Sequence, residues 1–293
     1  MAGAKEIRTR MKSVEQTLKI TNAMYLISSA NLRKAKEKLG QAAPYFIKVY
    51  TTISDILHRS PQLDNVFFDQ RPGVPAERRR VGFVVVSGDK GLAGAYNHNV
   101  LKLAEERIRA AACPQVFVAG LVGRAYFQER GIPICPEFEY VVQNPNMHRA
   151  RSMGDELVQR FLDRQLDEIH LLYTEMVSPL QLEVRERTLL PLSPENFPWE
   201  PPGEKTVPTV TYIPSPNAVL SHIVPGYIRG MLFGALVEAF CAEQNARMTA
   251  METASDNARE MLKELSLTYN RARQTAITQE ITEIAGGARN ARD

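Results

Sequence analysis

The chain has 293 residues, 44% of them hydrophobic, which is enough for one large domain or for a modest domain with extended elements. A formal net charge of +3 is too small to predict a nucleic-acid-binding protein. Three cysteines without CxxC spacing and five scattered histidines predict neither a disulfide scaffold nor a metal site, and they favour a reducing compartment.

Residues 1–60 predict one long coiled-coil helix. No glycine or proline interrupts the chain between Gly3 and Gly40. Pro44 is expected to kink the helix, and the pattern ends by Pro61. Apolar residues recur in steps of four and three, with Thr21 in the one vacant place, at Ile7, Met11, Val14, Leu18 and Tyr25. This alternation is the a/d seam of a coiled coil.

Residues 61–80 are rich in chain breakers and predict a linker before a second domain over 81–215. Residues 81–86 form an apolar run of β-branched residues, typical of a strand buried on both faces. Helices are then predicted over 100–112 and 151–165, and further strands over 115–121, 168–176 and 182–190. Strands that alternate with helices indicate an open, mostly parallel, Rossmann-like α/β sheet. A proline-rich connector, residues 191–216, ends this domain.

Residues 216–293 predict a second coiled-coil helix. The 59 residues from 227 to 285 contain no proline, so they would form a helix of roughly 88 Å. A compact domain of about 135 residues has a radius of gyration of only about 14 Å. The helix must therefore extend past the sheet domain and pair antiparallel with the N-terminal helix.

The surface of this second helix is unusual. Between residues 241 and 260 its only large apolar residues are Met248 and Met251. Such a helix holds its partner weakly through the hydrophobic effect. Two interpretations remain open at this point, a slender shaft enclosed by other subunits and a solvated coiled coil with an alanine seam.

No membrane-spanning helix or signal peptide is expected. The longest apolar stretch, residues 231–241, is short and contains Glu238, with Arg229 just before it. A spanning helix needs about 20 apolar residues. The opening of the chain lacks the apolar core of a signal peptide. Any association with a membrane is therefore expected to run through a partner.

Three glycines, Gly88, Gly91 and Gly94, follow the first predicted strand. A Rossmann phosphate loop needs GxGxxG, whereas the spacing here is GxxGxxG, and there is no Walker A sequence. We interpret the segment as a tight turn that needs positive φ, with Asp89 and Lys90 as surface charges or partner contacts. No cofactor, metal or catalytic residue is predicted.

Three segments resemble the γ subunit of bacterial F-type ATP synthases. They are residues 2–38, the loop SGDKGLAGAYN at 87–97, and the C-terminal runs AEQNARMTAMETASDNA at 242–258 and YNRARQTAITQEITEIAGGAR at 269–289. The last run is similar to the family signature, with an Ile-Thr pair, Glu280, Glu283 and then Gly287-Ala288. The resemblance implies an antiparallel coiled coil of the two chain ends with an α/β domain inserted between them.

The resemblance also implies a function. The chain would be the non-catalytic central rotor stalk that couples ion-driven rotation of a membrane ring to conformational changes at the β catalytic sites. Its partners would be the alternating hexamer of α and β subunits, the ε subunit and the c-ring of the membrane sector. It would lie at the cytoplasmic face of the bacterial cell membrane as a peripheral protein, with no direct membrane insertion.

The family pattern assigns partner contacts to particular residues. Arg273, Gln274 and Thr278 match positions that contact the catalytic β subunit, and Met24 matches a position near the same region. Glu280 belongs to the C-terminal signature. The tip, residues 277–288, would sit in the bearing formed by the hexamer.

Several residues depart from the family pattern. Asn22 and Asn31 stand where the family usually has lysine, which weakens any contact there that needs a positive charge. Tyr212 lies in a connector that in the family runs near the membrane ring. Ile213 and Ser215 replace the carboxylates often found in that connector, so an ionic contact to the ring is weakened.

Two other function classes are open from the residues alone. One is an enzyme that binds a nucleotide in the α/β domain and dimerises through a coiled-coil arm. It predicts that the isolated chain binds ATP or NAD. The other is a coiled-coil adaptor unrelated to rotation, which predicts a stable oligomer of the chain alone.

Overall fold

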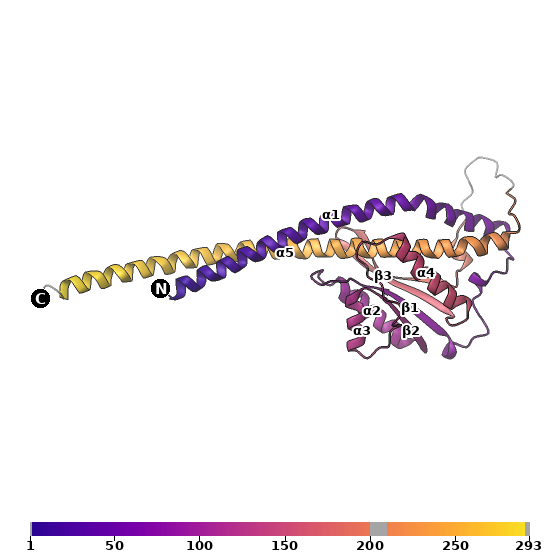
Figure 1. Cartoon of the computed structure of the whole chain (residues 1–293), viewed down its shortest axis with the longest axis horizontal. Coiled ribbons are helices and arrows are strands. Elements are labelled where there is room, and N and C mark those ends of the chain that lie inside the picture. Colours follow the sequence, from indigo (N-terminus) through magenta and orange to yellow (C-terminus); the bar gives the residue numbers. More distant parts are fainter. Residues whose placement is uncertain (1, 200–209, 291–293) are drawn as a thin grey trace. The chain divides into compact units, whose positions relative to one another are not determined.

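The computed structural model describes residues 2–199 and 210–290, and the chain divides into two units. The first contains residues 1–29 and 247–293, and the second contains residues 30–246. Two long helices, α1 (Ala2–Arg59) and α5 (Pro216–Asn290), each contribute to both units, and the sheet belongs to the second (Figure 1). The predicted pair of long terminal helices with a sheet between them is confirmed.

The sheet unit contains four strands in the order β2-β1-β3-β4. β1 pairs in parallel with β2 and β3, and β4 runs antiparallel to β3. The bounds are Arg80–Val86 for β1, Cys113–Ala119 for β2, Glu168–Ser178 for β3 and Gln181–Leu190 for β4. Each strand falls where a β-branched or apolar run predicted one, and the sheet is mixed, with one antiparallel edge.

Helices cover both faces of this sheet. Alternate residues of β1 point to opposite faces, so Phe83 and Val85 pack with α2 (Tyr96–Ala110) and α3 (Leu121–Glu129). Val84 and Val86 belong to a second buried cluster, which also contains residues of α4 (Met147–Leu162), α1 and α5. The sequence did not predict α3, whose nine residues are too few to show a clear helical period.

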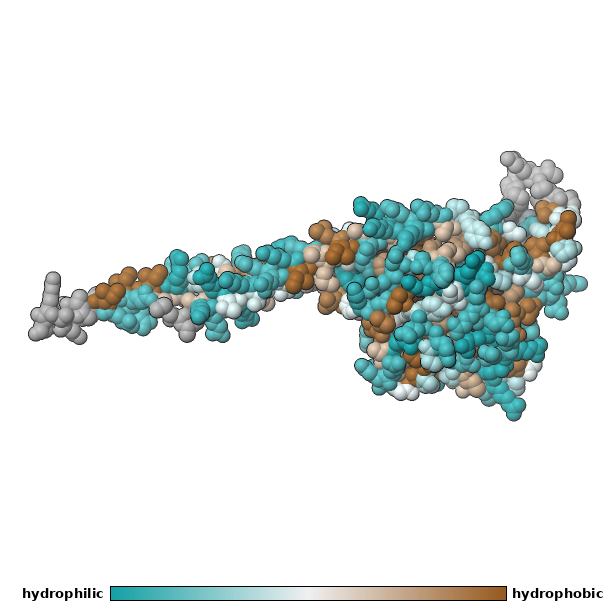
Figure 2. Space-filling view, in the orientation of Figure 1, coloured by the Kyte–Doolittle hydropathy of each residue, from teal (hydrophilic) through white to brown (hydrophobic). Residues whose placement is uncertain are grey.

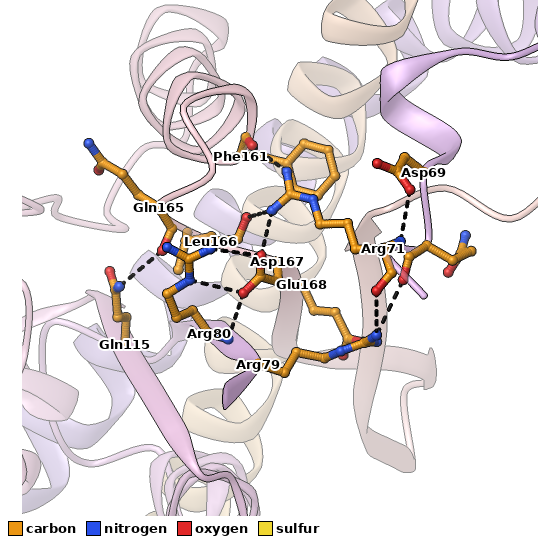
Figure 3. A network of polar contacts seen from close by, with 11 residues as sticks. Asp69, Arg71, Arg79, Arg80, Gln115, Phe161, Gln165, Leu166, Asp167 and Glu168 are labelled. Carbon is orange, nitrogen blue, oxygen red and sulfur yellow. Dashed lines mark hydrogen bonds and ion pairs between the residues drawn. The ribbon is translucent and has the colours of Figure 1, made fainter. Parts of the chain in front are cut away.

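A buried charge network fastens the starting ends of β1 and β3 (Figure 3). Asp167 is only 2% exposed, and its carboxylate accepts hydrogen bonds from Arg71 Nη1 at 2.7 Å and from the main-chain nitrogen of Arg80 at 2.9 Å. These donors hold the pKa of Asp167 well below its usual range, although burial alone would raise it. The Arg71 guanidinium lies 4.2 Å from the centre of the Phe161 ring.

α5 begins at the residue where the predicted C-terminal helix begins. The helix starts at Pro216, and the Ser215 hydroxyl accepts a hydrogen bond from the Ala218 nitrogen at 3.2 Å, as a cap does. Pro225 lies inside the helix without ending it. Buried residues on both sides of it, Val224 and Ile228, belong to the main core. The free energy gained by packing these buried residues outweighs the loss of the one backbone hydrogen bond that a proline cannot donate.

The first unit is a pair of antiparallel helical segments. The Thr21 and Ser255 hydroxyls form a buried hydrogen bond of 2.7 Å across the pair. On α1 the predicted seam positions are less exposed than their neighbours. On α5 the corresponding positions recur in steps of four and three, and half of them are small: Met251, Ser255, Ala258, Leu262, Leu265, Tyr269, Ala272 and Ala276.

α5 also bears on the expectation that no helix spans a membrane. It is the one helix among residues 2–199 and 210–290 that is long and apolar enough to cross a membrane, with an 18-residue window of mean hydropathy 1.3. The sequence argument rested on Arg229 and Glu238, which interrupt the apolar run without lowering its mean hydropathy far. Of that window, 56% is buried inside the protein, and a core helix passes the same test, so the finding is weak support for a membrane span.

Candidate partner-binding surface

The C-terminal part of α5 carries four of the predicted contact residues. Arg273, Gln274, Thr278 and Glu280 are all exposed. A spacing of seven residues places Arg273 and Glu280 on the same face of the helix, two turns apart. Gln274 and Thr278 are one turn apart on the adjoining face. The structure therefore gathers these four residues on one continuous helical surface.

This surface lies where α5 leaves its partner within the first unit. The bond between Thr21 and Ser255 sets an antiparallel register, which brings the first residues of α1 level with Arg273. α5 continues past that point, beyond the N-terminus of α1 (Figure 1). All residues from 277 to 284 are exposed. Over residues 277–284 the helix is thus open to solvent on every side.

An apolar stripe runs along these open turns. Ile277, Ile281 and Ile284 are spaced four and three residues apart and are 46%, 61% and 73% exposed. Figure 2 shows hydrophobic surface near the C-terminal end of the helix. An amphipathic helix end with exposed isoleucines gains free energy when another protein covers it. The predicted apolar tip continues to residue 288, but the side chains from 285 onward lie outside the described residues.

The polar groups beside the stripe differ in whether they already have a hydrogen-bond partner within the chain. The Thr278 hydroxyl donates to the Gln274 carbonyl at 2.9 Å, and the Thr282 hydroxyl donates to the Thr278 carbonyl at 2.8 Å. Arg273 and Glu280 form no ion pair with any side chain in 3–199 or 210–284. An arginine fork can bond a carboxylate through two donors. Arg273 and Glu280 are therefore the groups most open to a partner.

Met24 lies on α1, away from this surface. In the antiparallel register it is level with Glu252, 21 positions from Arg273, or roughly 30 Å along the helix. Met24 is half-buried, and it forms a separate apolar strip with Ile20 and Ile27, which are each 60% exposed. The sequence argument placed Met24 near the same contact region, whereas the structure provides two separate surfaces.

Tyr212 belongs to the sheet unit and has an internal partner. Its hydroxyl donates to Asp55 Oδ2 at 2.5 Å, and Asp55 also accepts from Arg59 Nε at 2.9 Å. Burial and this bond raise the pKa of Tyr212 to about 12, so the phenol remains protonated. The hydroxyl thus fastens the connector to the end of α1. Ile213, which follows it, is 82% exposed.

The glycine turn after β1 differs from the prediction in two ways. Only Gly94 has positive φ, at 54°, and the non-glycine Leu92 shares that conformation at 62°. Asp89 is not a surface charge, because it is 9% exposed. No local pattern predicts this burial, since the partners of Asp89 lie far along the chain.

The Asp89 carboxylate binds three main-chain N–H groups. It accepts from the nitrogens of Leu121 at 3.2 Å and of Val142 and Gln143 at 2.8 Å each. Leu121 is the first residue of α3, and a helix N-terminus is where a nucleotide phosphate would bind. Asp89 occupies these donors itself, so they are not open to a phosphate. The loop after β1 is instead bonded to the start of α3 and to residues 142 and 143.

A family model described as "ATP synthase" matches residues 3–290. The chain is 44% identical to the ATP synthase gamma chain of Acetivibrio thermocellus, over 98% of this chain and 99% of that one. It is 43% identical to the ATP synthase gamma chain of Ruminiclostridium cellulolyticum, over 97% of both chains. It is 37% identical to the sodium-ion-specific ATP synthase gamma chain of Acetobacterium woodii, again over 97% of both.

Solved structures share the fold. A chain in the Euglena gracilis mitochondrial ATP synthase, in an assembly of OSCP, F1 and c-ring, aligns with a TM-score of 0.64 at 13% identity, covering 97% of this chain and 93% of that one. A chain in the rotor of the same synthase aligns with a TM-score of 0.61 at 12% identity, covering 94% and 99%. At these identities the likeness concerns the fold alone.

Proposed function

This chain belongs to the ATP synthase gamma chain family, and from that premise we propose that it is the central rotor stalk of a bacterial F-type ATP synthase. It couples ion-driven rotation of the membrane ring to conformational changes at the catalytic sites of the β subunits. The observation that carries the proposal is the open C-terminal end of α5, with its exposed isoleucine stripe beside Arg273 and Glu280.

The physical mechanism is differential binding. A single asymmetric shaft touches equivalent sites in turn, and each contact stabilises one conformation of the site that it meets. A ligand shifts a conformational equilibrium only by its difference in affinity for the two states. The chemistry belongs to the α and β subunits, and this chain contributes neither a catalytic group nor a cofactor.

The partners follow from the same proposal. The alternating α and β hexamer surrounds the helical pair, while the sheet unit meets the ε subunit and the c-ring. The chain is a peripheral protein on the cytoplasmic face of the bacterial membrane. Tyr212 contributes to the ring contact by holding its connector in place through Asp55, so that the exposed Ile213 meets the partner.

Arg273, Gln274, Thr278 and Glu280 provide the contact to the β subunit. The free fork of Arg273 bonds a carboxylate, and the isoleucine stripe supplies non-directional affinity. Met24 makes a second contact through the separate apolar strip that it shares with Ile20 and Ile27.

The test is a complex reconstituted with a chain carrying Arg273→Ala and Gln274→Ala. A hydrogen bond to a charged group contributes about 1.5–3 kcal/mol, so we expect ATPase activity coupled to rotation to fall about tenfold or more. Arg259→Ala is the matched control, because Arg259 is exposed on the same helix and bonds only its neighbour Asp256 among the residues described. Circular dichroism should show an unchanged fold for both, and full coupled activity of the double variant would refute the assigned contact.

A further inference from the structure

Seven consecutive residues of α5 are buried, which sets this stretch apart from the rest of the helix. Residues 239–245 are between 0% and 8% exposed. Successive residues of an α-helix are turned by about 100°, so seven of them face every direction around the axis almost twice. An amphipathic helix would leave one face open. The sheet unit therefore encloses α5 on all sides here, and we call residues 239–245 the collared segment.

Three elements surround the collared segment. In Figure 1, α5 lies between α1 and the sheet in this unit. On the side of α1, Ala35 belongs to the same buried cluster as Phe240 and Cys241. On the side of the sheet, Ala242 packs with Ala93 and Tyr96 from the turn between β1 and α2. The third element is the hairpin between β3 and β4, which contacts the collared segment through a hydrogen bond.

That hydrogen bond is directional. Asn245 Nδ2 donates to the main-chain oxygen of Pro179 at 2.8 Å, and Asn245 is 8% exposed. Apolar contacts alone allow a helix to turn about its axis at little cost, because the hydrophobic effect has no direction. A buried amide bonded to a fixed carbonyl fixes the angle of the helix about that axis.

A second contact joins the collared segment to the loop that follows β1. A side-chain carbon added to Gly88 would lie 3.1 Å from Glu243 Cδ, closer than ordinary contact allows. The nitrogen of Gly88 donates to Asn97 Oδ1 at 2.7 Å, which fixes this loop onto α2. The backbone of Gly88 therefore lies against the buried carboxyl group of Glu243, which is 2% exposed.

We propose that the collared segment is the grip through which the sheet unit turns α5, with Asn245 and Gly88 as the positioning residues that fix the rotational angle of the helix. The proposal rests on the rotor function above. Seven buried positions prevent the helix from tilting, and the Asn245 hydrogen bond together with the close packing of Glu243 against Gly88 prevents it from turning. Torque applied to the sheet is thereby passed to α5.

Hydrogen exchange on the assembled complex tests the grip without reference to activity. Asn245→Ala removes the hydrogen bond to the Pro179 carbonyl, so the amides of the hairpin, residues 178 and 180–182, should exchange about fivefold faster. Asn257→Ala is the matched control, because Asn257 is exposed on the same helix outside the collared segment. Unchanged exchange at the hairpin in Asn245→Ala would overturn the proposal.

Coupling is measured in inverted membrane vesicles as ions moved for each ATP hydrolysed. Asn245→Ala combined with Gly88→Ala should lower this ratio at least about twofold while hydrolysis continues. A ratio equal to that of the native chain would also overturn the proposal. Should the double variant not assemble, the ratio is measured with Asn245→Ala alone. If the native complex itself shows no coupling, the rotor function fails, and the exchange measurement still decides on the grip.

Discussion

Replacing Asp167 with alanine tests whether the buried charge network stabilises the sheet unit. The change removes a carboxylate that bonds Arg71 Nη1 at 2.7 Å, the Arg80 nitrogen at 2.9 Å and Arg80 Nε at 3.0 Å. Arg71 is 8% exposed, so its charge would remain buried without its counter-ion. Breaking a buried pair in this way costs about 3–5 kcal/mol. A domain of ordinary stability has only about 5–15 kcal/mol in all.

Arg80→Ala is the graded comparison. The Arg80 side chain is 43% exposed, and its removal leaves the pair of Arg71 and Asp167 intact. A largely solvated ion pair contributes about 1 kcal/mol or less. Urea unfolding followed by tryptophan fluorescence reports on the sheet unit through Trp199, the single tryptophan. The reasoning is wrong if Asp167→Ala loses no more free energy of unfolding than Arg80→Ala does.

Two further predictions concern pH and backbone conformation. The pKa of Asp167 is lower in the folded chain than its unfolded value of about 3.8, so its contribution to the free energy of unfolding is present above pH 4 and is lost as pH falls toward the folded value. In urea titrations at acid pH, the stability of Asp167→Asn should therefore depend less on pH than that of the native chain. Equal pH dependence in the two chains would contradict this. Gly120 has a φ of 104°, and a side-chain carbon there would lie 2.3 Å from the Ser87 carbonyl oxygen. Gly120→Ala should lower the free energy of unfolding by about 3 kcal/mol or more, whereas Gly73→Ala, with nothing within 4 Å, should change it by less than about 1 kcal/mol in the same urea experiment.

Local patterns predicted the elements of this fold well. The β-branched run of residues 81–86 became β1, with one residue added at its start. The steps of four and three on α1 mark the positions that lie against α5 in the first unit. Both patterns follow from the period of the element itself, so a single sequence contains them. The nine residues of α3 show no such period, and that helix was missed.

Long-range polar contacts could not be predicted in the same way. Asp89 sits in a turn whose composition suggests an exposed charge, yet its partners, Leu121 and Val142, are 32 and 53 residues away. The hydroxyl of Tyr212 meets Asp55, 157 residues earlier in the chain. A single carboxylate or phenol has no periodic signature, and its burial depends on where the whole fold brings its partners. The resemblance to a family supplied the predicted contact residues on α5, whereas their exposure came from the structure.

α5 carries two kinds of surface along one helix, and their order has a physical reason. Residues 239–245 are enclosed on all sides, so side chains of different shape fit fixed neighbours there, and polar groups find directional partners. In the first unit, the small residues Ser255, Ala258 and Ala272 share the seam against α1 with a few large apolar ones. Small residues give up hydrophobic stabilisation, but they keep the helical pair slender and leave its outer faces free for other proteins. This division of the sequence fits the proposed rotor function, in which the sheet unit holds α5 in one stretch and other subunits contact it in another.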